Sequence, residues 1–184
     1  MRYMKDKLRG TGISVYPLDF QGPIDSAHLI YGNEFFYDLY EEPDFINHLL
    51  DLVHSALVRL MTDCLEIIQP DDYVAHYNNI ILPVKTPLKV SEDTSTLLGK
   101  EHIYEYCVPR TNALLEHFGG GYIHYCGFYP HLYQAVTTAM PRVIALNFGN
   151  PEKHDIPYVL RDLASKGLYY YGRDVNKSDI KPDS

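Results

Sequence analysis

Apolar residues follow two different spacings along this 184-residue chain. From Pro43 to about residue 69 they recur every three or four positions, which predicts a long helix with one wide apolar stripe. The stripe comprises Phe45, Ile46, Leu49, Leu50, Val53, Leu57, Leu60, Met61, Cys64, Leu65 and Ile68. A further long helix is predicted near the middle of the chain, bent near Pro109 because a proline inside a helix removes a hydrogen bond. That helix covers residues 100–118, and the other predicted helices cover residues 1–9, 24–31, 35–40, 131–139 and 155–166.

Alternating or continuous apolar runs between these helices predict short strands. The run 143–148 lies between Pro141 and Gly149 and is typical of a strand buried on both faces of a parallel sheet. Because strands alternate with helices, we expect an α/β fold with about five parallel strands. The predicted strands are 13–20, 88–91, 122–126, 143–148 and 168–171, and the stretch 73–87 indicates a functional loop or small hairpin.

Length and charge limit the classes of function. The chain is long enough for one domain, which we place at residues 1–172, followed by a polar tail at 173–184. The net charge of −8 disfavours binding to nucleic acid or to an anionic membrane, and no apolar run reaches transmembrane length. Three cysteines form no disulfide framework, so we expect a reducing cytoplasm.

Polar side chains gather where the predicted strands end. Parallel α/β folds place their active sites at the carboxyl edge of the sheet, so these positions are the first candidates for function. They are Asp19, Gln21, Glu92, Asp93, His124, Cys126, Asn147 and Asn150.

His124 and Cys126 are the pair with the most specific chemistry. Two positions apart on a strand, they share one face, where an imidazole and a thiol can hold a soft metal such as zinc. The alternative is a buried pair packed in the core, which is the role we expect for Cys64 and Cys107. The histidines His102, His117 and His154 are predicted on helix surfaces.

Several stretches taken together resemble the uroporphyrinogen decarboxylase superfamily. This superfamily includes the decarboxylase of tetrapyrrole synthesis and zinc-dependent methyltransferases that act on methylated corrinoid proteins. The resemblance covers about residues 10 to 172 and rests on the order and spacing of 21–28, 31–32, 38–43, 90–94, 119–127 and 147–152.

The resemblance implies a (β/α)8 barrel of the TIM type, which typically needs about 250 residues. This chain is similar to the carboxyl-terminal part alone, strands four to eight, so we expect a partial barrel. Open sheet edges would expose unpaired backbone groups, and we therefore expect a homo-oligomer.

The resemblance also implies roles for individual residues. His124 and Cys126 look like the first two zinc ligands of the methyltransferase branch. No cysteine follows Cys126, so a carboxylate, His76 or another chain would complete the site. Asp93 takes the catalytic position, with Glu92 beside it orienting the ligands or substrate; the alternative for Asp93 is an N-cap of the following helical run. The residues expected to bind substrate are Asp19, Gln21, His28, His76 and Asn147.

Three functions follow as expectations. The first is zinc-assisted methyl transfer from a methylated corrinoid, carried by a partner protein or free, to a thiol. The second is decarboxylation of uroporphyrinogen without a cofactor, which calls for arginines such as Arg173; the displaced position of Tyr31 relative to the family's catalytic tyrosine counts against it. The third is an inactive partial barrel that acts only within an assembly.

Overall fold

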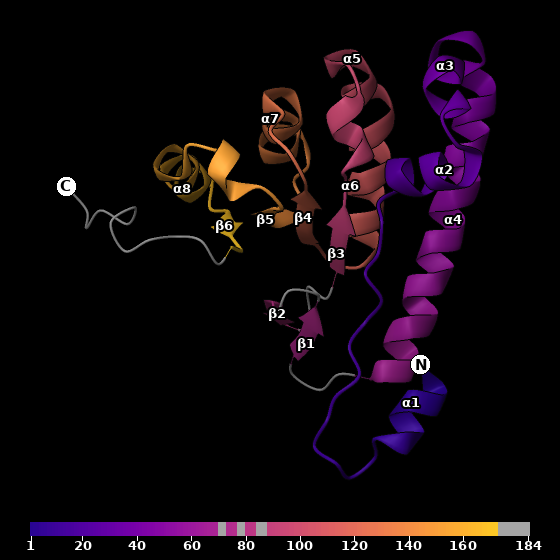
Figure 1. The fold of residues 1–184 in the computed structure, drawn as a ribbon, viewed down its shortest axis with the longest axis vertical. Coiled ribbons are helices and arrows are strands. Elements are labelled where there is room, and N and C mark those ends of the chain that lie inside the picture. The colour runs from indigo at the N-terminus through magenta and orange to yellow at the C-terminus, as the bar shows by residue number, and fades with distance from the viewer. Residues whose placement is uncertain (70–72, 77–79, 84–87, 173–184) are drawn as a thin grey trace.

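The structure is a computed structural model that describes residues 1–69, 73–76, 80–83 and 88–172, the two short middle segments by their backbone alone. It shows a mixed α/β fold around a four-stranded parallel sheet (Figure 1). The strands follow one another in chain order across the sheet: β3 (Leu88–Ser91), β4 (Gly121–Tyr125), β5 (Val143–Phe148) and β6 (Tyr169–Tyr170).

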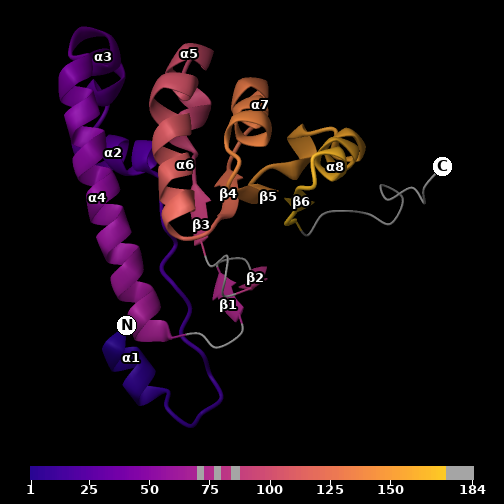
Figure 2. The ribbon, with the colours of Figure 1, turned by 180° about the vertical axis from the view of Figure 1, so that it is seen from behind.

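Helices connect these parallel strands and cover one face of the sheet. In Figure 1, β3 lies in front of α6, and in the reverse view of Figure 2 α6 lies in front of β3. The connections contain, in order, η2 (Thr94–Leu97), α5 (Lys100–His102), η3 (Ile103–Cys107), α6 (Val108–His117), α7 (Pro130–Ala139), η4 (Pro151–Lys153) and α8 (Ile156–Ser165).

The core lies between this helical layer and the sheet. Val90, Ile123 and Leu146 are in register on adjacent strands, and all three are fully buried. They belong to one apolar cluster that also contains residues of α4, α6, α7 and α8, among them Leu50, Leu114, Leu132 and Leu163.

The predicted helical stripe is confirmed in α4 (Pro43–Ile68), where it is narrower than expected. Six of its positions are buried: Ile46, Leu50, Val53, Leu57, Met61 and Cys64. Phe45 and Leu60 are instead 42% and 44% exposed. Two shorter helices precede α4 and pack at its amino-terminal end: α2 (Pro23–Tyr31) and α3 (Glu34–Glu41).

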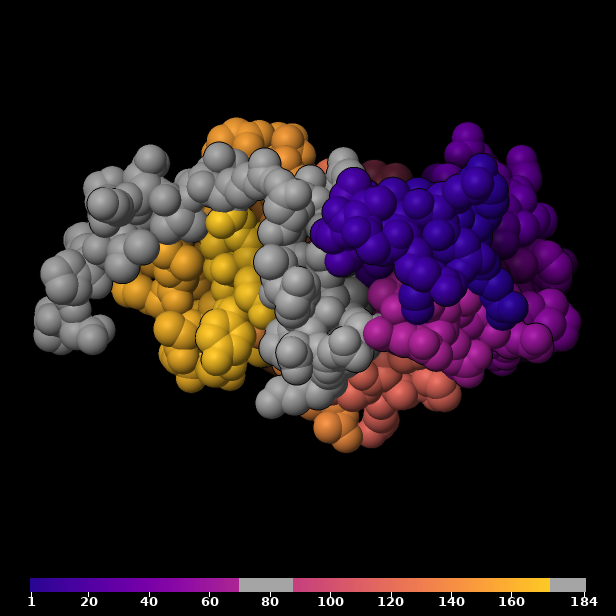
Figure 3. Space-filling view, turned by 90° about the horizontal axis from the view of Figure 1, so that it is seen from below, coloured from indigo at the N-terminus to yellow at the C-terminus, as the bar shows by residue number. Residues whose placement is uncertain are grey.

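The amino-terminal helix α1 (Arg2–Lys7) lies at the other end of α4. Lys5 Nζ donates to the carbonyl oxygens of Ile67 at 2.5 Å and Ile68 at 3.0 Å, two groups that have no partner within a helix. Figure 3 shows residues of this first segment, in indigo, lying over the end of α4. Gln69 then ends the helix in the left-handed region, with φ 48°.

The predicted helix 100–118 is not α-helical throughout, and the change lies just before Pro109. Ile103–Cys107 forms a π-helical turn immediately before α6. Because proline has no N–H, the carbonyl oxygen of Glu105 cannot receive the usual bond from position 109, and the wider turn accommodates this loss.

The predicted strand 13–20 is wrong. Among the described residues this segment forms no ladder; only its end pairs with the sheet, through a bridge between Gln21 and Ser91. Gly22 N donates to Ser91 O at 2.7 Å and Ser91 N donates to Phe20 O at 3.1 Å. Alternation of apolar and polar residues favours extended backbone, but a strand also needs a neighbour along its length.

Within the stretch 73–87, β1 (Tyr73–His76) and β2 (Ile80–Pro83) pair antiparallel, which confirms the hairpin alternative. The predicted tail 173–184, with Arg173, lies outside the described residues. No helix in the described part of the chain has the length and apolar character needed to cross a membrane.

Candidate metal centre

The face of the sheet opposite the helices carries a row of polar side chains. Ser91 is in register with His124, and His124 is in register with Asn147. Residues paired across a parallel sheet point to the same side, while their chain neighbours point to the other. Since Val90, Ile123 and Leu146 occupy the helix-covered side, the row of Ser91, His124 and Asn147 falls on the opposite side.

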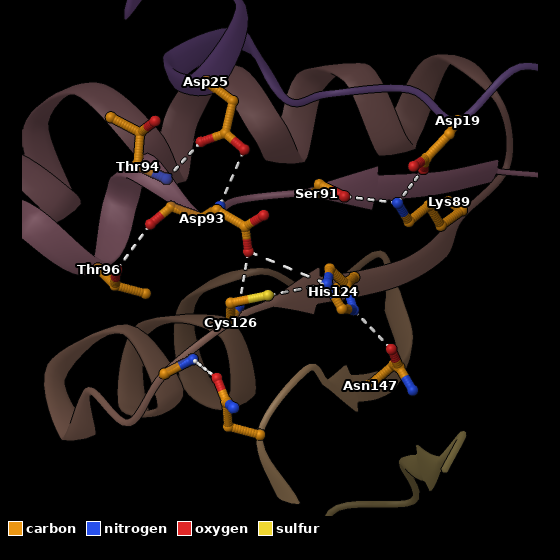
Figure 4. Close-up of polar contacts among 12 residues, drawn as sticks. Asp19, Asp25, Lys89, Ser91, Asp93, Thr94, Thr96, His124, Cys126 and Asn147 are labelled. Atoms are coloured by element: carbon orange, nitrogen blue, oxygen red, sulfur yellow. Dashed lines mark hydrogen bonds and ion pairs between the residues drawn. The ribbon is translucent and has the colours of Figure 1, made fainter. Parts of the chain in front are cut away.

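Three potential metal ligands converge at the carboxyl edge of this face (Figure 4). Asp93 follows β3, His124 lies near the end of β4, and Cys126 comes directly after β4. The Cys126 sulfur is 3.6 Å from His124 Nε2, and that nitrogen is 4.0 Å from Asp93 Oδ1. All three ligand atoms lie within 4.8 Å of one another, so the predicted pair and the predicted catalytic carboxylate form one cluster.

Asn147 fixes the orientation of the His124 ring. His124 Nδ1 donates to Asn147 Oδ1 at 2.5 Å, and the amide nitrogen of Asn147 donates to the carbonyl oxygen of Tyr171. The second bond determines which end of the amide faces the imidazole. In the neutral ring this bond holds the proton at Nδ1, and Nε2, which faces Cys126 and Asp93, is then the nitrogen that can bind a metal.

The carboxylate of Asp93 is directed into the cluster. Its Oδ1 accepts a hydrogen bond from the backbone N–H of Cys126 at 2.5 Å. Asp93 occupies the N-cap position of η2, yet its side chain makes no capping bond there. The carboxylate therefore serves the cluster and not the helical turn that follows it.

Cys126 sits in surroundings that oppose a free thiolate. Partial burial of the sulfur and the nearby Asp93 carboxylate both raise the pKa of the Cys126 thiol. The charge of a bound cation would outweigh both effects, because a metal deprotonates a coordinating thiol. Gly149 also shapes this place, since a Cβ at that position would lie 2.4 Å from the sulfur.

The donor set fits zinc. An imidazole nitrogen, a thiolate and a carboxylate are all common zinc ligands, and typical bond lengths place tetrahedral ligands about 3.3–3.7 Å apart. The separations of 3.6 Å and 4.0 Å are close to that range. Three protein ligands leave a fourth position for a water or a substrate, which is the pattern of catalytic zinc sites.

The other predicted substrate-binding residues take separate places. Asp19 pairs with Lys89, which lies two positions before Ser91 on β3 and is 3% exposed, so Asp19 is one row further from the carboxyl edge. Gln21 joins the sheet through its backbone. His28, on α2, contacts Thr94 Oγ1 through Nδ1 at 3.2 Å and Asn33 Oδ1 through Nε2 at 3.3 Å. His76 lies in β1, and its side chain is outside the described part of the chain.

Glu92 corrects one sequence expectation. Glu92 follows β3, and its carboxylate contacts the helical layer instead of the three ligands. It is fully buried, where Ser95 Oγ donates to it at 2.7 Å and Thr111 Oγ1 at 2.5 Å. Burial, followed by the charge of Asp25, raises the pKa of Glu92 to about 8.

Asp25 is a residue that the sequence reasoning missed. It is 2% exposed, and its carboxylate accepts the backbone N–H groups of Asp93 and Thr94. Burial raises its pKa to about 6, against the lowering effect of these two bonds. No sequence pattern links positions that are 68 residues apart, so the contact is visible in the fold alone.

A cleft of about 540 Å³ lies between α7 and α8, with Phe128, Tyr133, Tyr158 and His154 on its walls.

His154 was expected on a helix surface, and that expectation is wrong. It follows η4, stacks on Phe148 with ring centroids 3.8 Å apart, and its Nε2 donates to the carbonyl oxygen of Gly127 at 3.0 Å. Partial burial lowers its pKa. Cys64 and Cys107 are buried, as predicted.

No protein-family model, curated protein or solved structure matches this chain. The family resemblance of the sequence stays a prediction, and any conclusion about function has to rest on the geometry of the site.

Proposed function

We propose that this protein is a zinc-dependent enzyme that activates a thiol for methyl transfer from a methylated corrinoid. The observation that supports this most directly is the convergence of Asp93, His124 and Cys126, whose ligand atoms lie within 4.8 Å of one another. Two of these residues were expected as ligands and the third as a catalytic residue from the sequence alone. The carboxylate of Asp93 supplies the further ligand that the pair lacked.

The charges of the three side chains suit this role. When zinc is bound it acts as a Lewis acid that lowers the pKa of a coordinated thiol. Cys126 gives up its proton, Asp93 remains a carboxylate and His124 stays neutral with its proton at Nδ1. The two negative charges of these side chains balance a divalent cation, so a substrate thiol can approach as its thiolate without a large excess of negative charge.

The proposed transfer is balanced in atoms and electrons. The substrate thiol loses its proton to solvent, and its sulfur forms a bond to the methyl carbon. The carbon–cobalt bond of the corrinoid breaks, and its electron pair remains on cobalt. Asn147 contributes by keeping the His124 ring in place through the 2.5 Å hydrogen bond.

The proposal also covers the fold, which we infer to be the carboxyl-terminal part of a (β/α)8 barrel. Parallel strands in chain order, joined by helices that cover one face, are what the carboxyl-terminal part of a (β/α)8 barrel would look like. We propose that copies of the chain associate, because among the described residues β6 has no strand on its outer side and β3 pairs there only through the bridge at Ser91. Light scattering at micromolar concentration tests this, and a monodisperse monomer would contradict it.

Metal analysis tests the site itself. Protein purified without added metal should contain close to one zinc per chain, and His124→Ala and Cys126→Ala should each lose it. His131→Ala is the matched control, because His131 is exposed on α7 and should keep full occupancy. Absence of zinc from a folded wild-type protein that also fails to bind added zinc would overturn the proposal.

An activity assay tests the chemistry. Methylcobalamin and a small thiol, mixed with the zinc-loaded protein, should yield the S-methylated thiol and the spectral change of demethylated cobalamin. Asp93→Asn should reduce the rate by at least about tenfold, as expected for loss of an interaction at a metal site. A zinc-loaded wild-type protein without this activity would keep the metal site and reject methyl transfer.

A second candidate is supported by one observation. Cys126, His124 and Asn147 form the sequence of contacts found in cysteine nucleophiles, with distances of 3.6 Å and 2.5 Å. The raised pKa of Cys126 opposes it, because a nucleophilic cysteine needs a lowered value. Slow alkylation of metal-free protein by iodoacetamide at pH 7 would favour the zinc enzyme, and rapid alkylation of Cys126 would favour the nucleophile.

A further inference from the structure

The loop that carries Asp93 is held by a residue from a distant part of the chain. Asp25 lies in the first turn of α2 and is 2% exposed. Its Oδ2 accepts the N–H of Asp93 at 2.9 Å, and its Oδ1 accepts the N–H of Thr94 at 2.6 Å (Figure 4). One carboxylate therefore binds two successive amides at the beginning of η2.

These amides need a partner from outside the turn. The first N–H groups of a helical turn have no acceptor within it, and the residue at the N-cap usually supplies one from its own side chain. Here the N-cap residue is Asp93, whose carboxylate turns instead toward Cys126 and His124. An N-cap side chain accepts from the second or third amide of the turn. Asp25 instead accepts the two amides on either side of the Asp93 Cα atom, so it fixes the main chain from which the Asp93 side chain leaves.

A second contact from α2 reaches the same place. His28 lies three positions after Asp25, on the same face of the helix, and its Nδ1 is 3.2 Å from Thr94 Oγ1. Gly22, just before α2, is in close contact with Glu92, since a Cβ there would lie 2.2 Å from a carboxylate oxygen. The amino-terminal half of α2 thus holds the main chain of residues 93 and 94 and the side chain of Thr94.

We propose that Asp25 is a positioning residue for the metal centre, which holds the Asp93 carboxylate in the direction that lets it act as a ligand beside His124 and Cys126. This inference rests on the proposed metal site. It assigns to Asp25 no contact with metal or substrate, because both of its oxygens are engaged by the backbone.

The test compares two buried carboxyl groups, of which Asp25 accepts backbone amides and Glu92 accepts side-chain hydroxyl groups. Asp25→Asn keeps the size of the side chain but places an NH₂ group against one of the two amide donors. Glu92→Gln is the matched control, because Glu92 is equally buried and is held by hydroxyl groups on the side away from the cluster. Affinity is measured by titration with Co²⁺, whose absorption bands report both the thiolate and the ligand geometry.

We expect Asp25→Asn to bind Co²⁺ at least about tenfold more weakly than the wild type, with altered absorption bands, and Glu92→Gln to bind it as the wild type does. Thermal unfolding shows whether each variant is folded at the titration temperature. Equal affinity and unchanged bands in a folded Asp25→Asn protein would overturn the inference. An equal loss in Glu92→Gln would also overturn it, since the effect would then come from general loosening of the core.

A metal-independent measurement separates this inference from the proposed function. In the metal-free wild type, the amides of Asp93 and Thr94 should be protected from hydrogen exchange, and Asp25→Asn should remove much of that protection. If wild-type protein binds neither zinc nor Co²⁺ while the amide effect is seen, the proposed metal site fails although Asp25 does hold the loop. If both amides exchange freely in the wild type, the positioning role fails by itself.

Discussion

The two faces of the sheet differ in the side chains that they carry at the carboxyl edge, although they are built from alternate residues of the same strands. One face carries Val90, Ile123 and Leu146 against the helices, and the other carries Ser91, His124 and Asn147 one position further along. A slip of one residue in register would exchange the two sets. The pairing that buries the core is therefore also what assembles the candidate metal centre, and the two faces should respond differently to substitution.

The largest effect is expected on the helix-covered face. Ile123→Ala removes a fully buried side chain from the centre of the core, which should lower the free energy of unfolding by about 2–5 kcal/mol. Urea denaturation gives this value. A loss below about 1 kcal/mol would show that this face does not carry the stability assigned to it.

On the opposite face, truncation of a side chain to alanine should weaken metal binding. Asn147→Ala frees the His124 ring, and we expect the affinity for Co²⁺ to fall about 10–100-fold. Ser91→Ala lies in the same row and serves as the control, because its hydroxyl accepts from Lys89 at 2.5 Å and has no contact with the three ligands in Figure 4. Similar affinities for the two variants would contradict the role of Asn147.

The buried carboxyl group of Glu92 should make the stability of the folded protein depend on pH. Its pKa is raised from 4.5 to about 8, so between these values the folded protein keeps a proton that the unfolded chain has lost. Stability should therefore fall as pH rises through this window. Glu92→Gln resembles the protonated form and removes this contribution, so its stability relative to wild type should rise by more than about 1 kcal/mol from pH 5 to pH 8.

Urea midpoints at pH 5, 6, 7 and 8 measure this difference. Asp25, whose pKa is about 6, should leave a smaller decline in the variant, confined to the acidic part of the range. A gap between variant and wild type that does not change with pH would show that Glu92 is ionised in the folded protein.

The smallest effect is expected on the outer side of the helical layer. Leu60 belongs to the apolar stripe in the sequence, but it is 44% exposed in α4. Leu60→Gln should change the free energy of unfolding by no more than about 0.5 kcal/mol, measured again by urea denaturation. A loss comparable to that of Ile123→Ala would mean that something covers this side of the helix.

Much of the fold could be predicted because local pattern determines it. The run 143–148 lies between Pro141 and Gly149, and the strand β5 has the predicted bounds. Pro43 begins α4 as expected, since proline suits the first turn of a helix. Residues 13–20 show the limit of this reasoning, because their alternation says nothing about whether another strand lies beside them.

The proximity of the three side chains in the candidate site follows from the same kind of local pattern. His124 and Cys126 share a face through the two-residue period, and Asp93 follows a neighbouring strand, so the edge of a parallel sheet brings them together. Asp25 could not be found this way. It reaches Asp93 from α2, and only the packing of that helix against the end of β3 makes the contact.

Gly149 limits which residues positions 126 and 149 can hold together in related sequences. Its missing side chain leaves the space that the Cys126 sulfur occupies, and a Cβ there would force the sulfur out of its present place. In a set of homologous sequences, a larger residue at position 149 is therefore expected mainly where position 126 is not a cysteine or where its side chain takes another direction.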